Sequence, residues 1–143
     1  MDIVQVLRED HDELRQLVKK CSFSRSPANR EKYFVELKQA FEMHSFIEPL
    51  IFYPALLEAG IDPAHVRARQ EEIVRLMAEL DSVTPEDESW LPAFRTIKKR
   101  IEGYLAEEEE DVLPLSREKL DPDVLEKLGA QMVAKTAEQR AVQ

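Results

Sequence analysis

The sequence predicts an all-helical protein, an antiparallel up-down four-helix bundle with an additional C-terminal helix. Hydrophobic residues make up 43% and charged residues 34% of the chain, and glycine occurs only three times, a composition that favours helices with a charged exterior. Apolar residues recur at alternating spacings of three and four, which is typical of a helix packed against near-parallel neighbours. Proline-containing start signals divide the chain into segments of helical length.

Four dipeptides mark these starts, because each joins a good N-cap residue to a proline whose missing N–H is harmless in the first turn. They are Ser26-Pro27, Asp62-Pro63, Thr84-Pro85 and Asp121-Pro122. Thr84-Pro85 is expected to begin only a short turn before a second start at Ser89. The expected helices are residues 2–20, 29–59, 63–81, 89–115 and 122–139. We expect residues 1–120 to form the bundle and residues 121–143 to pack on it as the C-terminal helix.

Each of the first four helices has one seam, a row of mainly apolar residues at spacings of three and four, that should face a common core. The seam positions are Val4, Leu7, His11, Leu14 and Val18 in the first helix; Phe34, Leu37, Phe41, His44, Glu48, Ile51 and Ala55 in the second; Val66, Gln70, Ile73, Met77 and Leu80 in the third; and Phe94, Ile97, Ile101, Tyr104, Glu108, Asp111 and Leu115 in the fourth. The last helix, with Leu125, Leu128 and Met132, is expected outside the bundle or across one end.

Charge and hydropathy exclude several classes of protein. A net charge of -9, with basic residues scattered among acidic ones, argues against a nucleic-acid partner. No apolar run approaches the roughly 20 residues that span a bilayer, and the first residues lack the features of a signal peptide, so we expect a cytoplasmic protein without a membrane partner. The single cysteine, Cys21, is expected to be a buried or half-buried structural thiol.

Six polar residues lie in the apolar seams, where an unpartnered polar group is costly. They are His11, His44, Glu48, Gln70, Tyr104 and Glu108, and every one of the four bundle helices contributes at least one. Two pairs of these residues repeat one pattern, His44 with Glu48 and Tyr104 with Glu108. In each pair a potential ligand lies four residues before a glutamate, on the same helix face. Imidazole, carboxylate and phenol groups suit iron, manganese or zinc, and a metal cation would neutralise both glutamates.

These residues make the chain resemble the hemerythrin-like, or HHE cation-binding, domains. The resemblance rests on His11 in the first helix, on His44 and Glu48 followed by Phe52-Tyr53-Pro54-Ala55-Leu56, and on Glu108 followed by an acidic stretch and proline. It implies a non-haem di-iron bundle in which histidines cap two metal ions and two carboxylates bridge them. Members of the family bind or sense dioxygen, respond to nitric oxide or peroxide, or store iron.

The sequence departs from the family pattern at two ligands. Gln70 stands where the third helix should present histidine, and Tyr104 stands where the fourth should. In the family these two histidines belong to the same metal ion, so the resemblance implies one intact half-site and one altered half-site. The simplest expectation is a single metal ion, preferably iron, bound by His11, His44, Glu48 and Glu108. A second ion held by Tyr104, Gln70 and the two carboxylates is an alternative.

The altered positions leave several interpretations open. Tyr104 either completes the site as a phenolate, which would favour ferric iron, or packs in the core with its hydroxyl on a carboxylate. Gln70 is expected to hydrogen-bond a ligand or water rather than bind the metal. Pro49 withholds a helical hydrogen bond from Ser45, so it should kink or bulge the second helix beside the site.

The remaining histidine and most of the acidic run are expected to lie on the surface. His65 is off the seam of its helix, and within residues 107–111 only Glu108 and, less strongly, Asp111 fall on the inward side.

Two functions from different classes fit these expectations. The first is a metal-binding, iron-containing protein that acts on dioxygen, peroxide or nitric oxide. The second is a metal-free structural or interaction module, in which His11 and His44 are protonated and hydrogen-bonded to the two glutamates. Di-iron oxygen carriage is disfavoured, because one ion would lack its imidazole ligands.

Overall fold

The computed structural model describes residues 1–142, which contain helices and no strand. The helices are α1 (Ile3–Ser22), α2 (Pro27–Ile51), α3 (Tyr53–Glu58), α4 (Ala64–Asp81), α5 (Trp90–Glu107), the π-helical segment η1 (Glu108–Val112), α6 (Leu113–Lys119) and α7 (Pro122–Ala141). The predicted all-helical fold with an additional C-terminal helix is therefore confirmed.

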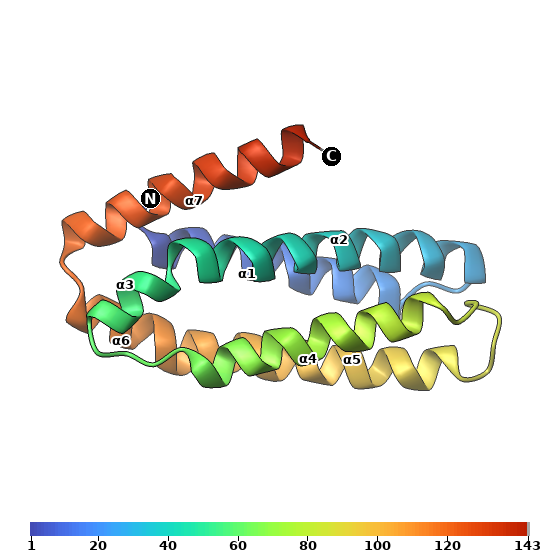
Figure 1. Cartoon of the computed structure of the whole chain (residues 1–143). Helices are drawn as coiled ribbons and strands as arrows, with labels where there is room; N and C mark the ends of the chain where they lie inside the picture. The colour runs from blue at the N-terminus through green and yellow to red at the C-terminus, as the bar shows by residue number, and fades with distance from the viewer. Residues whose placement is uncertain (143) are drawn as a thin grey trace.

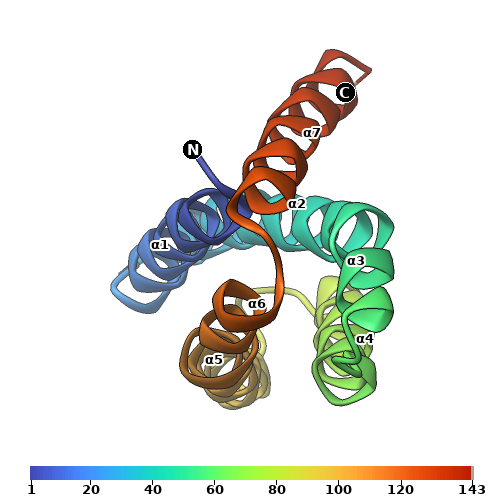
Figure 2. The same ribbon diagram turned by 90° about the vertical axis from the view of Figure 1, so that its left-hand side faces the viewer.

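The four long helices α1, α2, α4 and α5 lie side by side and alternate in direction (Figure 1). Seen along their axes, they occupy the corners of a square, with α1 and α2 on one side and α5 and α4 on the other (Figure 2). The predicted seams point inward, so that Leu7, Leu37, Ile73 and Ile101 are almost completely buried. Burial of these four seams around one core holds the bundle together.

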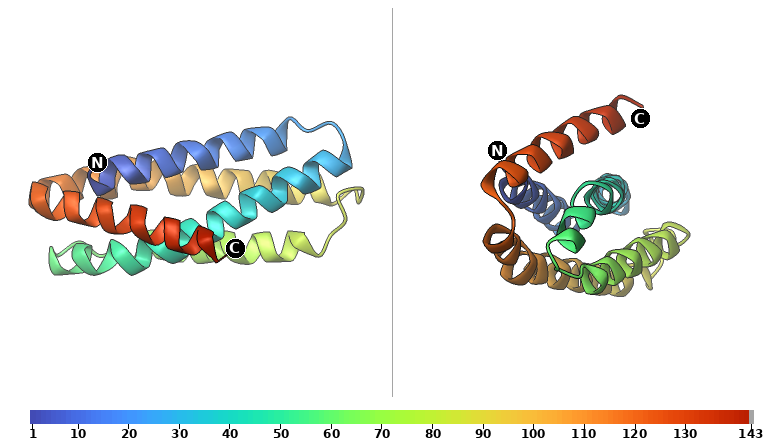
Figure 3. Two further views of the ribbon diagram at one scale, coloured as in Figure 1. Left: turned by 90° about the horizontal axis from the view of Figure 1, so that it is seen from above. Right: turned by 60° about the vertical axis from the view of Figure 1, so that its left-hand side comes forward.

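The helix α7 lies outside the square, along α1 and α2 (Figure 3). Its apolar side buries Leu125, Leu128 and Met132. Gly129 lies where α7 crosses the start of α1, and a Cβ atom there would meet the backbone of residues 1–3. The close approach requires glycine, which explains its place inside a helix despite its low helix propensity.

Two of the predicted helices are interrupted. The helix expected over residues 29–59 divides at Phe52 into α2 and α3, and α3 turns away from the axis of α2 (Figure 1). Pro49 and Pro54 provide the physical reason, because neither can donate the helical hydrogen bond to the carbonyl four residues earlier. The backbone recovers one bond where Phe52 N donates to the carbonyl of Glu48 over 2.8 Å.

The helix expected over residues 89–115 is likewise not continuous. It consists of α5, the π turn η1 and α6, and the π turn begins at Glu108. Pro114 follows closely and leaves the carbonyl of Glu110 without its helical donor. A π turn shifts the register of the residues after it, and the inward positions become Val112 and Leu113, whereas Asp111 is exposed. The weaker expectation that Asp111 points inward was wrong for this reason.

No helix within residues 1–142 combines the length and the apolar character needed to cross a membrane.

Candidate metal centre

The structure brings all six polar seam residues into one buried cluster in the middle of the bundle. His44 is 4% exposed, and the other five are completely buried. The residues are His11 from α1, His44 and Glu48 from α2, Gln70 from α4, Tyr104 from α5 and Glu108 from η1. The sequence therefore predicted the members of this cluster.

Four of these residues offer ligand atoms at a common point. One ligand atom from each of His11, His44, Glu48 and Glu108 lies within 4.8 Å of the other three. The imidazole rings of His11 and His44 are adjacent, with centroids 5.3 Å apart. Two imidazoles and two carboxylates on converging helices form a donor set that suits a divalent or trivalent first-row metal.

Three donors hold Glu48, and all of them bind the same carboxylate oxygen. Its Oε1 accepts hydrogen bonds from the hydroxyl of Tyr53 (3.1 Å), from Nε2 of Gln70 (2.7 Å) and from the hydroxyl of Tyr104 (3.0 Å). Its Oε2 is buried and has no hydrogen-bond partner within the described residues. The hydrogen bonds therefore fix the orientation of the carboxylate and leave one oxygen free to bind a cation.

Glu108 has the same asymmetry. Its Oε1 lies 3.0 Å from Nε2 of His11, while its Oε2 is buried without a partner among residues 1–142. Burial raises the pKa of Glu108 to about 7. Burial, followed by the neighbouring charge of Glu108, raises the pKa of Glu48 well above its ordinary value. Two buried carboxyl groups with free oxygens are costly to ionise without a cation, so this donor set fits a metal ion.

The hydroxyl of Tyr104 contacts three other members of the cluster, His44, Gln70 and Glu48. It lies 2.7 Å from Nε2 of His44 and accepts from Nε2 of Gln70 over 2.7 Å. Burial, with the charges of Glu108 and Glu48, raises the pKa of Tyr104 well above its ordinary value. Without a cation the phenol is therefore neutral and hydrogen-bonded, as the packing interpretation expects, yet its oxygen is next to a potential ligand nitrogen.

Gln70 presents its amide nitrogen to the site, because its amide oxygen is occupied. Nη1 of Arg67 donates to Oε1 of Gln70 over 3.3 Å and to the main-chain carbonyl of Ser45 over 2.9 Å. The carbonyl of Ser45 is the one that Pro49 leaves without a helical donor. The amide nitrogen can only donate, which agrees with the expected hydrogen-bonding role of Gln70.

Sequence reasoning missed the residues that hold the outer ring nitrogen of His11. Nδ1 of His11 lies 2.7 Å from Oε2 of Glu109, and Nη2 of Arg15 donates to both oxygens of Glu109 over 2.8 Å. The sequence pattern predicts a solvated face for the acidic run, apart from Glu108 and Asp111. The spacing of four between His11 and Arg15 puts both on one face of α1, but nothing local in the sequence indicates that Glu109 lies between them.

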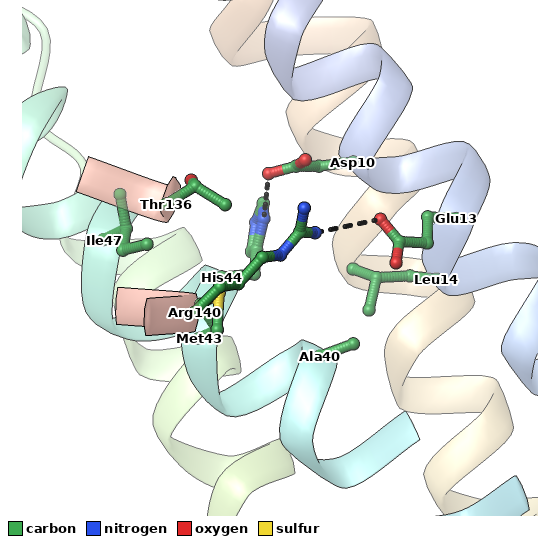
Figure 4. A pocket seen from close by; sticks show the side chains of 9 residues that line it. All are labelled: Asp10, Glu13, Leu14, Ala40, Met43, His44, Ile47, Thr136 and Arg140. Atoms are coloured by element: carbon green, nitrogen blue, oxygen red, sulfur yellow. Dashed lines mark ion pairs between the residues drawn. The ribbon is translucent and has the colours of Figure 1, made fainter. Parts of the chain in front are cut away.

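The outer nitrogen of His44 faces a small pocket between α1, α2 and α7 (Figure 4). Nδ1 of His44 is buried without a hydrogen-bond partner in the described chain and lies 3.6 Å from the carboxylate of Asp10. The pocket encloses about 30 Å³, enough for one water-sized molecule. Glu13 and Arg140 lie 3.8 Å apart on its wall (Figure 4). His44 is thus held less tightly through its outer nitrogen than His11.

His65 and Cys21 lie apart from this cluster, as predicted. His65 is exposed and pairs with Glu107. Cys21 is buried, and burial raises the pKa of its thiol to about 12, so it is an inert core residue.

The family model described as the Hemerythrin HHE cation binding domain matches residues 2–116. The chain belongs to this family. The match runs from α1 into α6 and contains every residue of the cluster. The resemblance expected from the sequence is therefore confirmed, and cation binding is the property that the family name carries.

Known relatives agree with this assignment. The uncharacterized protein Rv2633c of Mycobacterium tuberculosis is 30% identical over 98% of this chain and 88% of its own length. The crystal structure of a hemerythrin HHE cation-binding domain-containing protein from Mycobacterium kansasii, described as a homologue of Rv2633c, superposes with a TM-score of 0.89 at 26% identity. It covers 99% of this chain and 89% of that one, so the additional helix α7 lies within the shared fold.

A more distant match reaches part of a longer protein. A DNA nickase of Nostoc is 21% identical over 94% of this chain but only 39% of its own length.

Proposed function

We propose that this chain is a non-haem iron protein that interacts with dioxygen, peroxide or nitric oxide at a site for one metal ion. The ligands would be His11, His44, Glu48 and Glu108, with Tyr104 as an additional ligand when the iron is ferric. An iron ion there would supply a redox-active Lewis acid with a coordination position open to a small molecule. Manganese and zinc are the alternative metals that the same donors accept.

The observation that carries the proposal is the convergence of four buried ligand atoms within 4.8 Å, with one free oxygen on each carboxylate. A buried pair of acids this close gains most from a cation, which replaces mutual repulsion by attraction. Membership of a cation-binding family supports the same reading.

A single ion is favoured over two by the orientation of Gln70. A second ion beside Tyr104 and Gln70 would need the amide oxygen of Gln70, but Arg67 occupies that oxygen and the nitrogen faces the cluster. The altered half of the site would therefore position Glu48 and Tyr104 through hydrogen bonds rather than hold metal.

A metal-free structural or interaction module is the second candidate. The hydrogen bonds around Glu48 and between His11 and Glu108 favour it, because they satisfy much of the buried polarity without a cation. The free oxygens of both glutamates count against it. The cytoplasmic location and the lack of a nucleic-acid partner stay predictions.

Metal content distinguishes the two candidates. Protein from iron-supplemented growth would be compared by elemental analysis with the variants His44→Ala and His65→Ala. We expect iron in the unmodified protein and in His65→Ala, whose histidine is exposed, and little in His44→Ala. A metal content near zero in all three would favour the metal-free module.

Reactivity is tested on the loaded protein. Dioxygen, hydrogen peroxide and nitric oxide would each be mixed with the reduced iron form while its visible spectrum is recorded. A spectral change with at least one of them is expected, and an inert spectrum with all three would contradict the proposed small-molecule function.

A further inference from the structure

Arg15 and Glu109 connect the surface of α1 to the outer ring nitrogen, Nδ1, of His11. The His11 ring is completely buried, Glu109 is 19% exposed and Arg15 is 43% exposed. The contacts along this chain are short, at 2.7 Å between Nδ1 of His11 and Oε2 of Glu109 and 2.8 Å between Nη2 of Arg15 and both oxygens of Glu109. The three residues come from two elements, α1 and η1, that meet beside the cluster.

We propose that Glu109, held in place by Arg15, is the positioning residue for His11 at the metal centre. A carboxylate only accepts hydrogen bonds, so Nδ1 of His11 must carry a proton when it faces ionised Glu109. In the neutral ring, Nε2 then keeps its lone pair, which faces Oε1 of Glu108 at 3.0 Å and lies where the four ligand atoms converge. Glu109 thereby selects the tautomer that binds metal and fixes the rotation of the ring.

Arg15 fixes the orientation of the Glu109 carboxylate. Its guanidinium contacts both oxygens of Glu109 from one nitrogen and also donates to Asp12 over 3.2 Å, which anchors it on its own helix. An ion pair that holds a carboxylate by both oxygens restricts its rotation more than a single contact does. The π turn η1 matters as well, because it begins at Glu108 and carries both Glu108 and Glu109 against α1.

The two histidines are consequently positioned unequally. His11 has a direct hydrogen bond to a carboxylate that is itself fixed, whereas Nδ1 of His44 lies 3.6 Å from Asp10 beside the small pocket. A separation of 3.6 Å is too long for a hydrogen bond. The His11 side of the centre is thus preorganised before metal arrives, and the inference rests on the proposed function in that His11 is a metal ligand.

The test begins with the metal-free protein. The ¹⁵N chemical shifts of the His11 ring report which nitrogen carries the proton. We expect protonated Nδ1 in the unmodified protein and in Glu109→Gln, whose amide oxygen still accepts, and a mixture of tautomers in Glu109→Ala. An unchanged tautomer in Glu109→Ala would overturn the inference, and this readout does not require that the protein bind metal.

Metal affinity provides the second readout. Iron(II) binding would be measured for Glu109→Ala, Arg15→Met and the matched control Glu110→Ala, whose side chain is exposed in the same π turn. We expect a loss of about 10- to 100-fold for Glu109→Ala, a smaller loss for Arg15→Met, and no change for Glu110→Ala. Equal affinity of Glu109→Ala and Glu110→Ala would overturn the inference. No binding by the unmodified protein would instead refute the proposed function, while the tautomer measurement would still decide the role of Glu109.

Discussion

Arg67 donates to the main-chain carbonyl of Ser45 over 2.9 Å, across the contact between α4 and α2. This carbonyl is available because Pro49, four residues later, has no N–H to offer it. The same nitrogen of Arg67 also reaches the amide oxygen of Gln70 and so turns the amide nitrogen toward Glu48. A proline next to a candidate ligand is thereby linked to the orientation of a neighbouring amide.

The link between Arg67 and Pro49 predicts non-additive mutations. Arg67→Met should lower the free energy of unfolding by about 1–2 kcal/mol, because the carbonyl of Ser45 and the amide of Gln70 lose a donor. In a Pro49→Ala background the loss should be smaller, since the new N–H of residue 49 can satisfy Ser45. Urea denaturation of the four metal-free proteins forms a double-mutant cycle. Equal losses in both backgrounds would show that Arg67 does not depend on the proline.

The raised pKa of Glu108 predicts the pH dependence of stability in the metal-free protein. Burial raises this pKa from 4.5 to about 7, so between these values the folded state keeps a proton that the unfolded state releases. The resulting stabilisation is present below pH about 4.5 and is lost as the pH rises through about 7. Its size is on the order of 3 kcal/mol, at about 1.4 kcal/mol per pKa unit.

Glu108→Gln should remove this part of the pH dependence, and Glu118→Gln, which alters an exposed carboxylate in α6, should retain it. Urea midpoints from pH 4 to pH 8 provide the measurement. Added iron should oppose the trend, because metal binding requires ionised carboxylates and stabilises only the folded state. Identical pH profiles for the two variants would mean that Glu108 does not titrate as described.

The sequence predicted the buried cluster because helical periodicity is a local property. His11, His44, Glu48, Gln70, Tyr104 and Glu108 each interrupt an apolar seam, and seams must face the core of a bundle. Periodicity also placed His65 on the surface correctly. The family pattern then distinguished the four candidate ligands that match it from Gln70 and Tyr104.

The missed features depend on backbone geometry or on contacts between helices. The kink expected at Pro49 takes the form of a division at Phe52, whereas the π turn η1 was not foreseen, and a regular register carried through it misplaced Asp111. The partnership of Glu109 with Arg15 joins residues 94 positions apart. Only the relative placement of α1 and η1 reveals it, because a charged residue beside a seam has no periodic signal of its own.

Tyr104 predicts a visible signature of the iron-loaded protein. Its hydroxyl lies 2.7 Å from Nε2 of His44, so a ferric ion bound by His44 could also bind the phenolate and give a charge-transfer band. Tyr104→Phe should lose this band. Tyr53→Phe is the matched control, because Tyr53 also donates to Glu48 but should leave the band in place. A spectrum unchanged by Tyr104→Phe would leave Tyr104 as a packing and hydrogen-bonding residue.

Gly129 predicts how tightly α7 is attached to the bundle. A Cβ atom at this position would contact the carbonyl of Met1 and lie 2.8 Å from the carbonyl carbon of Asp2 and 2.9 Å from the nitrogen of Ile3. Backbone cannot move aside as a side chain can, so Gly129→Ala should destabilise the protein by about 1–3 kcal/mol. This overcrowding must outweigh the gain of about 1 kcal/mol in helix propensity that alanine brings.

Gly103→Ala is the matched control, because there a Cβ atom would meet only Nη1 of Arg69 at 3.1 Å, the end of a flexible side chain. Urea denaturation should find Gly103→Ala as stable as the unmodified protein or slightly more stable. Equal stability of both variants would mean that α7 can move away from the start of α1 without a loss in the free energy of unfolding. Because α7 supplies Thr136 and Arg140 to the pocket beside His44, such a loosely held helix would also leave the outer side of His44 more open to solvent.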